Sequence, residues 1–504
     1  MKNENEKGKR ADEVFSLTDI QLAYLLGRNP ELFLGGNSTH FYVEINTQLD
    51  PVRLEQSINK VILQQPMLRT IILQEGKQKI LSEVPEYKLS VSDISSLSED
   101  KQKDCILAER KATSHRKFKT DSWPLFSFRM FKLNDKNYRL IADLAMMIMD
   151  GLSTEILINA VMQFYNGEKT DITVPSYTFK DYVCQQEQER AKSYESDMAF
   201  WKGQATKMPS APELNVNIKE NHIYNFEQKE YIISAEQWSE IKTYLRSKRV
   251  MPAMFLLGIY ADMLSRWSNQ SEFTVNLTTT NRRGDVRKLE NIIGDFTEVM
   301  PVDVHLNGEK DIYTVAKELQ KTVTLYRKHS TIGGIAVMKE IARSSGENKK
   351  AIFPVVFTSM LYDSAKSSWN QLGERVYQIS QTPQVLLDNT ANERNGSLII
   401  RWDYLEECFD KETIQNMFEY YVKGILQVIN SAPPEINDEV LWDKYNTTAD
   451  NSIPKTTLQQ LFVKQAEKTP DKTAVVCGDK SITYSELNKK SEKVCRPANR
   501  RRES

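Results

Sequence analysis

The sequence predicts an α/β fold of two lobes that face one another. Two blocks of comparable size each mix helix-like and strand-like hydrophobic patterns, as layered α/β domains do. A charged, helix-like stretch at residues 174–203 lies between the blocks and is expected to bridge them. The chain has 504 residues, which at about 100 to 200 residues per domain suggests two to four units.

Five segments are predicted along the chain. Residues 1–13 are polar and are expected to be a flexible N-terminus. The N-terminal lobe is assigned to residues 14–180 and the C-terminal lobe to residues 181–435. Residues 436–455 lie in a region rich in Pro, Asn and Thr and are expected to be a linker, and residues 456–504 form a last, shorter segment.

Hydrophobic periodicity assigns the main elements of the N-terminal lobe. Residues 39–45 and 138–146 resemble strands, and residues 50–73 contain apolar side chains at helical spacing. The residues that share this helix face are Leu54, Ile58, Val61 and Ile62.

In the C-terminal lobe, residues 252–268 predict a helix and residues 272–280 a strand. Residues 383–405 predict a β-hairpin, because Asn395-Gly396 favours the positive φ angles that a two-residue turn requires.

Composition excludes several classes of function. Lys and Arg (67) balance Asp and Glu (68), which does not favour nucleic acid or an anionic membrane as partner. There is no apolar leader and no apolar run near the about 20 residues of a membrane helix. Five scattered cysteines without a CxxC pair are typical of reduced thiols. Reduced thiols and the polar first residues predict a cytoplasmic protein. The five histidines lack ligand spacing and no GxGxxG or Walker motif occurs, so no metal site is expected.

Residues 141–153, IADLAMMIMDGLS, predict a strand that ends at Met149, a tight turn at Asp150-Gly151 and a helix capped by Ser153. Such a turn directs neighbouring groups into the space between two lobes. Taken alone, the pattern is more typical of a core strand followed by a glycine turn.

Four further segments give the turn a context. Together with it they resemble, in order, the motifs of heterocyclization domains, a branch of the condensation domains of nonribosomal peptide synthetases. The resemblance covers roughly residues 14–435. The four segments are residues 17–28, 294–304, 353–361 and 379–410.

The resemblance implies two chloramphenicol-acetyltransferase-like lobes in a V-shaped pseudo-dimer with a central tunnel. It also implies a reaction: an upstream acyl or peptidyl thioester is condensed with Cys, Ser or Thr on a carrier protein, and cyclodehydration then gives a thiazoline or oxazoline. Upstream and downstream peptidyl carrier proteins supply the phosphopantetheine arms. The domain itself is expected to bind no cofactor and to be monomeric when excised.

Cyclodehydration needs a group that takes and returns protons, a task suited to a positioned carboxylate with a hydrogen-bonding partner. Thr358 and Asp388 match the positions that the family uses for this step, with Asp388 as acid and base. Without the resemblance, Thr358 would be read as a strand residue and Asp388 as a solvated carboxylate. Gln381 and Gln384 are candidates to line the tunnel, or else to hydrogen-bond a loop backbone.

The turn itself departs from the family. Condensation domains have HHxxxDG there and heterocyclization domains DxxxxD; aligned on Asp150, the first aspartate becomes Ala145 and the histidine position becomes Met146. Asp143 lies two residues earlier, on the same strand face but about 6.6 Å away. Three interpretations of Ala145 stay open: an engineered substitution, a natural change that weakens condensation, or a degenerate domain that only binds carriers.

Asp150 is expected to be structural rather than catalytic. In the family the equivalent aspartate pairs with an arginine, and Arg282, or less favourably Arg283, is available after a strand. An ion pair near a lobe interface would fix the turn that contains Gly151, since removal of one member leaves the other unpaired.

The last segment suggests a neighbouring domain. Residues 458–494 resemble the start of an adenylation domain, whereas residues 495–504, CRPANRRRES, depart from it and look appended. We therefore expect a truncated adenylation domain, an excised piece of a larger synthetase and a downstream adenylation partner. Two other functions remain open: a docking module without catalysis, and a CoA-dependent acyltransferase, although the latter normally has a histidine at the turn.

Overall fold

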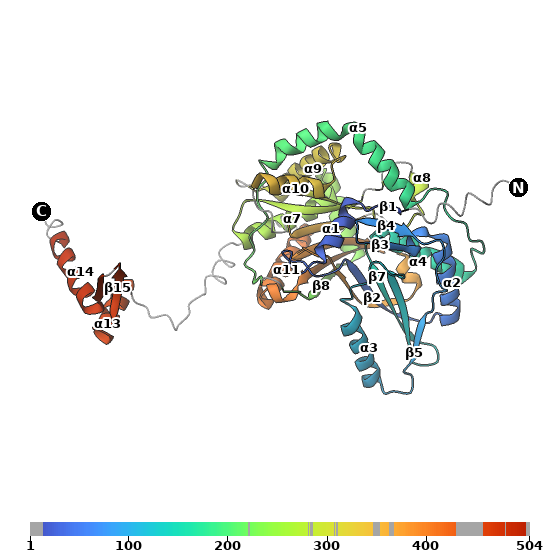
Figure 1. Cartoon of the computed structure of the whole chain (residues 1–504), viewed down its shortest axis with the longest axis horizontal. Helices are drawn as coiled ribbons and strands as arrows, with labels where there is room; N and C mark the ends of the chain where they lie inside the picture. Colours follow the sequence, from blue (N-terminus) through green and yellow to red (C-terminus); the bar gives the residue numbers. More distant parts are fainter. Residues whose placement is uncertain are drawn as a thin grey trace. The chain divides into compact units, whose positions relative to one another are not determined.

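The computed structural model describes residues 14–219, 222–280, 282, 286–306, 308, 311–345, 353–361, 367–429, 457–478 and 480–499. The predicted N-terminus at 1–13 and linker at 436–455 lie outside these residues. The chain divides into two compact units, residues 1–433 and 434–504, and each is considered by itself (Figure 1).

A five-stranded sheet in the order β12-β2-β7-β6-β5 forms the N-terminal lobe. Its strands are β2 (His40–Thr47), β5 (Ser90–Asp93), β6 (Phe126–Lys132), β7 (Tyr138–Ala145) and β12 (Glu374–Gln381). Strand β12 comes from the C-terminal half of the chain and pairs antiparallel with β2. The assignment of residues 181–435 to one lobe therefore does not hold for β12, which sequence proximity could not place.

Helices and a small second sheet complete this lobe. The elements are β1 (Val14–Ser16), α1 (Asp19–Gly27), α2 (Pro51–Gln64), η1 (Pro66–Arg69), β3 (Thr70–Leu73), β4 (Lys77–Ile80), α3 (Glu99–Thr113) and α4 (Gly151–Asn166). Strands β1, β4 and β3 form the small sheet. Helices α2 and α4 pack together, and the predicted apolar face of α2 is buried in the core.

Helix α2 ends earlier than the periodicity suggests. Gln65 adopts an extended conformation because it precedes Pro66, whose ring disfavours a helical residue before it. The apolar residues that follow therefore belong to η1 and β3 instead.

The C-terminal lobe contains a six-stranded sheet in the order β10-β9-β11-β13-β14-β8. Its strands are β8 (Phe226–Ile233), β9 (Glu272–Thr280), β10 (Thr297–His305), β11 (Val355–Met360), β13 (Leu387–Arg394) and β14 (Ser397–Leu405). The predicted strand at 272–280 and the hairpin with Asn395-Gly396 are confirmed, and both turn residues have positive φ (51° and 80°).

Helices of this lobe pack around its core. They are α6 (Ala235–Ser247), α7 (Pro252–Ser268), α9 (Ile312–Lys328), α10 (Gly334–Ser345) and α11 (Lys411–Leu426), and the short turn η3 (Glu406–Cys408) adds Cys408 to the same core. The short elements α8 (Val286–Leu289) and η2 (Ser368–Gln371) instead contribute Leu289 and Trp369 to the core of the N-terminal lobe. The predicted helix at 252–268 is confirmed as α7, which lies against α9 and α11.

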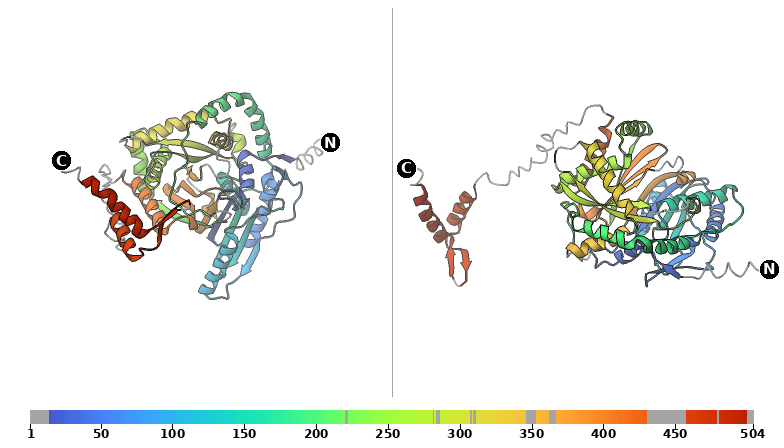
Figure 2. Two further views of the ribbon diagram at one scale, coloured as in Figure 1. Left: turned by 60° about the vertical axis from the view of Figure 1, so that its left-hand side comes forward. Right: turned by 90° about the horizontal axis from the view of Figure 1, so that it is seen from above.

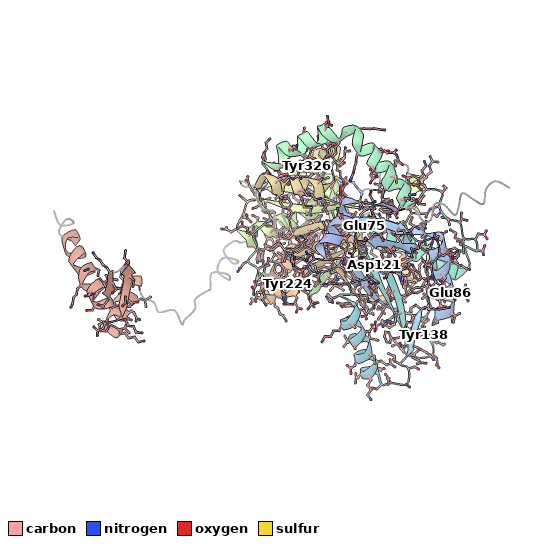
Figure 3. All side chains as sticks on the ribbon, viewed as in Figure 1. Glu75, Glu86, Asp121, Tyr138, Tyr224 and Tyr326 are labelled. Carbon is pink, nitrogen blue, oxygen red and sulfur yellow. The ribbon has the colours of Figure 1, made fainter. Side chains whose placement is uncertain are left out.

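Helix α5 (Phe179–Ala205) bridges the two lobes, as its charge and length predict (Figures 1 and 2). Near its start, Phe179 and Tyr182 belong to the core of the N-terminal lobe, whereas Trp201 near its end belongs to the other core. Trp201 packs on Tyr326 of α9, with 4.8 Å between ring centroids, and Tyr326 is labelled below α5 in Figure 3. This helix fixes the spacing of the lobes.

The second unit is small. It consists of α13 (Leu458–Lys468), the antiparallel strands β15 (Thr473–Cys477) and β16 (Lys480–Thr483), and α14 (Tyr484–Asn499). Its interpretation as the start of an adenylation domain stays a prediction. In the described part of the chain, no helix combines the length and apolar character needed to cross a membrane.

Candidate active site

A cavity of about 630 Å³ lies between the lobes and is lined by side chains of both. This volume falls in the range of pockets that enclose small organic molecules, about 300 to 1,000 Å³. The N-terminal lobe contributes α1, the turn before α4 and β12, whereas the C-terminal lobe contributes β9, β11, β13, β14 and α10. The cavity is the place where residues distant in sequence can meet a substrate.

Thr358 and Asp388 converge on this cavity. Strands β11 and β13 run parallel, and both side chains line the cavity on the sheet's inner face. The Thr358 hydroxyl donates a hydrogen bond to Asp388 Oδ1 over 3.1 Å. Burial and, to a smaller extent, the nearby Asp403 raise the pKa of Asp388 to about 7, while the Thr358 hydrogen bond opposes the shift. A carboxyl with this pKa can both donate and accept a proton near neutral pH.

Asp403 of β14 is a member of the site that sequence reasoning missed. It lies directly opposite Asp388 in the hairpin and lines the same cavity. It is 3% exposed and accepts hydrogen bonds from Gln228 Nε2 (3.2 Å) and the Ser380 backbone N–H (3.4 Å). The sequence could have revealed Asp403, because the predicted two-residue turn at Asn395-Gly396 fixes the register of the hairpin and so places residue 403 opposite residue 388.

The turn before α4 differs from its prediction. Strand β7 ends at Ala145, not at Met149, and residues 146–149 form an irregular turn. There the Met146 N–H donates to the Thr39 carbonyl (3.2 Å) and the Ile148 N–H to the Ala145 carbonyl (3.3 Å). Residues 147–149 are apolar and lie in the core of the N-terminal lobe, so their sequence resembles a continuation of the strand.

Asp150, not Ser153, is the N-cap of α4. Its carboxylate accepts a hydrogen bond from the Ser153 N–H over 2.7 Å, so the predicted cap at Ser153 is wrong by three residues. The predicted ion pair is present: Arg282 Nη2 lies 3.1 Å from Asp150 Oδ1 and 2.8 Å from Ser153 Oγ. Ser153 also donates to the Gly294 carbonyl (2.8 Å), and the Arg282 guanidinium stacks on Phe296, 4.0 Å from its centroid. Arg283 lies outside the described residues.

The three residues Asp150, Ser153 and Arg282 are called the brace below. Together they tie the first turn of α4 to the segment before β10, across the boundary between the lobes. Gly151, which follows the cap, lines the cavity, and a Cβ there would approach Met360 Sδ to 3.4 Å. The brace therefore sets the position of one wall of the cavity.

Ala145 and Asp143 do not line the cavity. Ala145 is 5% exposed and belongs to the core of the N-terminal lobe. Asp143 is buried in contact with His40 Nε2 and forms an ion pair with Arg116, whose Nε lies 3.1 Å from its carboxylate. Asp143 consequently cannot stand in for the family's first aspartate as a group in the cavity. Met146, at the histidine position, does line it.

The two glutamines have different positions. Gln384 lines the cavity and also serves the loop backbone, because its N–H donates to the Leu34 carbonyl over 2.8 Å. Its side-chain Nε2 donates to the Phe33 carbonyl (3.4 Å). Gln381 at the end of β12 is 2% exposed and is not among the lining residues, so its prediction as a tunnel residue is wrong. The position of Gln381 at the end of a strand does not tell whether its side chain faces the cavity or the core.

Among the described residues, no three His, Cys, Asp or Glu side chains gather as a metal-binding cluster.

Comparison with known proteins extends these observations. The family model of the condensation domain matches residues 17–448. Bacitracin synthase 1 of Bacillus licheniformis is 32% identical over 496 residues, covering 96% of this chain and 9% of that protein. Phenyloxazoline synthase MbtB of Mycobacterium tuberculosis (strain ATCC 25618 / H37Rv) is 27% identical, covering 96% of this chain and 35% of that protein. The chain thus spans well under half of either relative.

Solved structures show the same architecture. The EpoB NRPS cyclization-docking bidomain from Sorangium cellulosum superimposes with a TM-score of 0.79 at 28% identity, covering 85% of this chain and 87% of that one. The nonribosomal peptide synthetase FmoA3 (S1046A) gives a TM-score of 0.75 at 25% identity, covering 95% of this chain and 50% of that one. The predicted two-lobed fold class is confirmed.

Proposed function

Because this chain belongs to the condensation-domain family of nonribosomal peptide synthetases, in its heterocyclization branch, we propose that it forms and then cyclizes a peptide bond. An acyl or peptidyl thioester on an upstream carrier is condensed with Cys, Ser or Thr on a downstream carrier. The side chain then attacks the new amide carbonyl, and loss of water leaves a thiazoline or oxazoline.

The observation that supports ring closure best is the hydrogen-bonded pair of Thr358 and Asp388 in the cavity. When the thiol or hydroxyl adds to the amide carbon, its proton passes to the carbonyl oxygen. Protonated Asp388 then donates its proton to the departing hydroxyl, and the resulting carboxylate takes the amide N–H proton as the C=N bond forms. Asp388 ends as it began, and Thr358 holds its carboxyl in place.

Partners follow from the same proposal. Carrier proteins deliver both substrates on phosphopantetheine arms, and the domain works beside an adenylation domain of the same synthetase. The names of two relatives, phenyloxazoline synthase MbtB and pyochelin synthetase PchF of Pseudomonas aeruginosa, are compatible with such a synthetase. Residues 457–499 would then be the start of the adenylation domain.

Ala145 does not by itself argue against ring closure. The side chain at this position lies in the core, away from the cavity that contains Asp388. A docking module is the second candidate, favoured by Ala145 and Met146 at positions where the family has polar groups. The CoA-dependent acyltransferase is disfavoured, because Met146 stands where that chemistry needs a histidine.

Incubation of the protein with an acyl carrier and a cysteinyl carrier, followed by mass measurement of the product, separates these functions. An open amide and a thiazoline differ by one water. Ring formation is expected. Amide alone would indicate a condensation-only domain, and no product at all would indicate a docking module.

A further inference from the structure

Two buried carboxyls share the cavity, and the proposed reaction uses only one of them. Asp388 and Asp403 are directly opposite residues of β13 and β14, and both line the cavity. The Cβ atoms of such cross-strand pairs are about 4.5 to 5.5 Å apart. Two carboxylates at this separation in a buried site disfavour double ionisation, so one of them tends to keep its proton.

The hydrogen bonds decide which of the two is charged. Asp403 accepts from Gln228 Nε2 and from the Ser380 N–H, and the cationic Arg401 lies two residues away on the same strand face. Asp388 accepts from the neutral Thr358 hydroxyl. Donors and a nearby cation favour the ionised form, which places the negative charge on Asp403 and the proton on Asp388.

We propose that Asp403 is a positioning residue for ring closure: its carboxylate keeps the proton on Asp388, the group that donates to the departing hydroxyl. This inference rests on the proposed function. The pKa values have the required order, because burial raises that of Asp403 only to about 6 while Arg401 and the hydrogen bonds oppose the shift. For Asp388, burial and Asp403 together give about 7.

Other titratable groups facing the pair do not change this assignment. Three of these groups are Tyr24, Tyr260 and Tyr377, and burial raises their pKa values, so their hydroxyls are neutral near pH 7. The carboxylate of Glu230 is paired with the Arg401 guanidinium over 2.6 Å. The elements that carry these groups are α1 (Tyr24), α7 (Tyr260), β12 (Tyr377), β8 (Glu230) and β14 (Arg401).

The test is the pH profile of ring formation from the open amide on its carrier. In wild type, the rate should fall as pH rises through the pKa of Asp388. In Asp403→Asn that fall should begin at lower pH, so the rate near pH 8 drops severalfold further. Asp403→Glu should restore much of the wild-type profile. Asp295→Asn removes another buried carboxyl, outside the lining of this cavity, and should keep the wild-type midpoint.

An unchanged midpoint in a folded Asp403→Asn variant would overturn the inference. If that variant does not fold, Gln228→Ala, which removes one donor to Asp403 at a partly exposed position, should move the midpoint in the same direction. A midpoint that stays in place in Gln228→Ala would contradict it equally.

A second readout does not need activity, which separates this inference from the proposed function. The folded pKa of Asp388, about 7, exceeds the unfolded value of about 3.9, so its contribution to stability is lost as pH rises between them. The difference in unfolding free energy between wild type and Asp388→Asn isolates that loss. In the Asp403→Asn background the same loss should be smaller and end at lower pH. An identical loss in both backgrounds would contradict the role of Asp403 even if no ring forms in any variant.

Discussion

At the scale of single residues, the hydroxyl of Thr358 should matter for ring closure and little for condensation. Thr358→Val keeps the strand and the shape but removes the hydrogen bond to Asp388. A hydrogen bond to a charged or reacting carboxyl is worth about 1.5 to 3 kcal/mol, so the ratio of ring to open amide should fall by about 10- to 100-fold. Thr358→Ser keeps the hydroxyl and is the matched control. Equal loss in both variants would point to packing instead.

A second residue-scale prediction concerns Ala145. Restoring the family's aspartate, Ala145→Asp, places a carboxylate in a buried position on the strand face of Asp143, whose charge is already paired with Arg116. We expect the unfolding free energy to fall by about 2 kcal/mol or more in urea titration, because the new charge is desolvated beside another. Ala145→Ser controls for size. A stabilised variant with faster amide formation would instead mean that Ala145 is a damaged catalytic position.

The sequence predicted some of these residues and not others. Thr358 and Asp388 were found because they match the family's motifs, and Arg282 because the equivalent aspartate in the family pairs with an arginine. The structure shows the hydrogen bond between Thr358 and Asp388 and the ion pair between Arg282 and Asp150. Asp403 was missed although the Asn395-Gly396 turn implied its register. Gln381 was misplaced, because its burial depends on tertiary packing and no local pattern in the sequence reports it.

At the scale of secondary-structure elements, the brace should hold α4 against the opposite lobe. Asp150→Ser keeps an N-cap but removes the ion pair with Arg282 and should cost about 3 kcal/mol, since the buried guanidinium is left unpaired. The double variant with Arg282→Leu should lose less than the sum of the single variants in chemical denaturation. Additive losses would show that the pair is not coupled.

Element boundaries were predicted well where a local signal ends the element. Helix α7 and strand β9 match their predicted bounds, and α7 begins with Pro252, a favoured first helical residue. The end of β7 was missed because the buried residues that follow it are as apolar as a strand. Tertiary burial, which periodicity does not measure, determined that boundary.

At the scale of the whole molecule, the pairing of β12, a strand from the C-terminal half of the chain, with β2 of the N-terminal lobe should make the folding of the two lobes interdependent. Without β12, strand β2 would expose an unpaired edge. We therefore expect residues 14–180, produced alone, to aggregate, whereas residues 1–433 stay monodisperse in light scattering. Adding residues 370–382 to the fragment as a tethered strand should reduce the aggregation. A monodisperse, cooperatively unfolding fragment without β12 would contradict this expectation.

Two lobes, a bridging helix and a cavity between them were predictable, because alternating patterns and motif order constrain them. The pairing of β12 with β2 was not, since such a long-range contact leaves no periodic trace in either strand.

The most direct measurement follows the open amide on its carrier in a single turnover with Asp388→Asn, whose fold is checked by thermal unfolding. The amide should form at the wild-type rate and then persist, with ring formation at least about 100-fold slower, the usual effect of losing a general acid and base. Ring formation at the wild-type rate would contradict the assignment of this carboxyl to the cyclodehydration step.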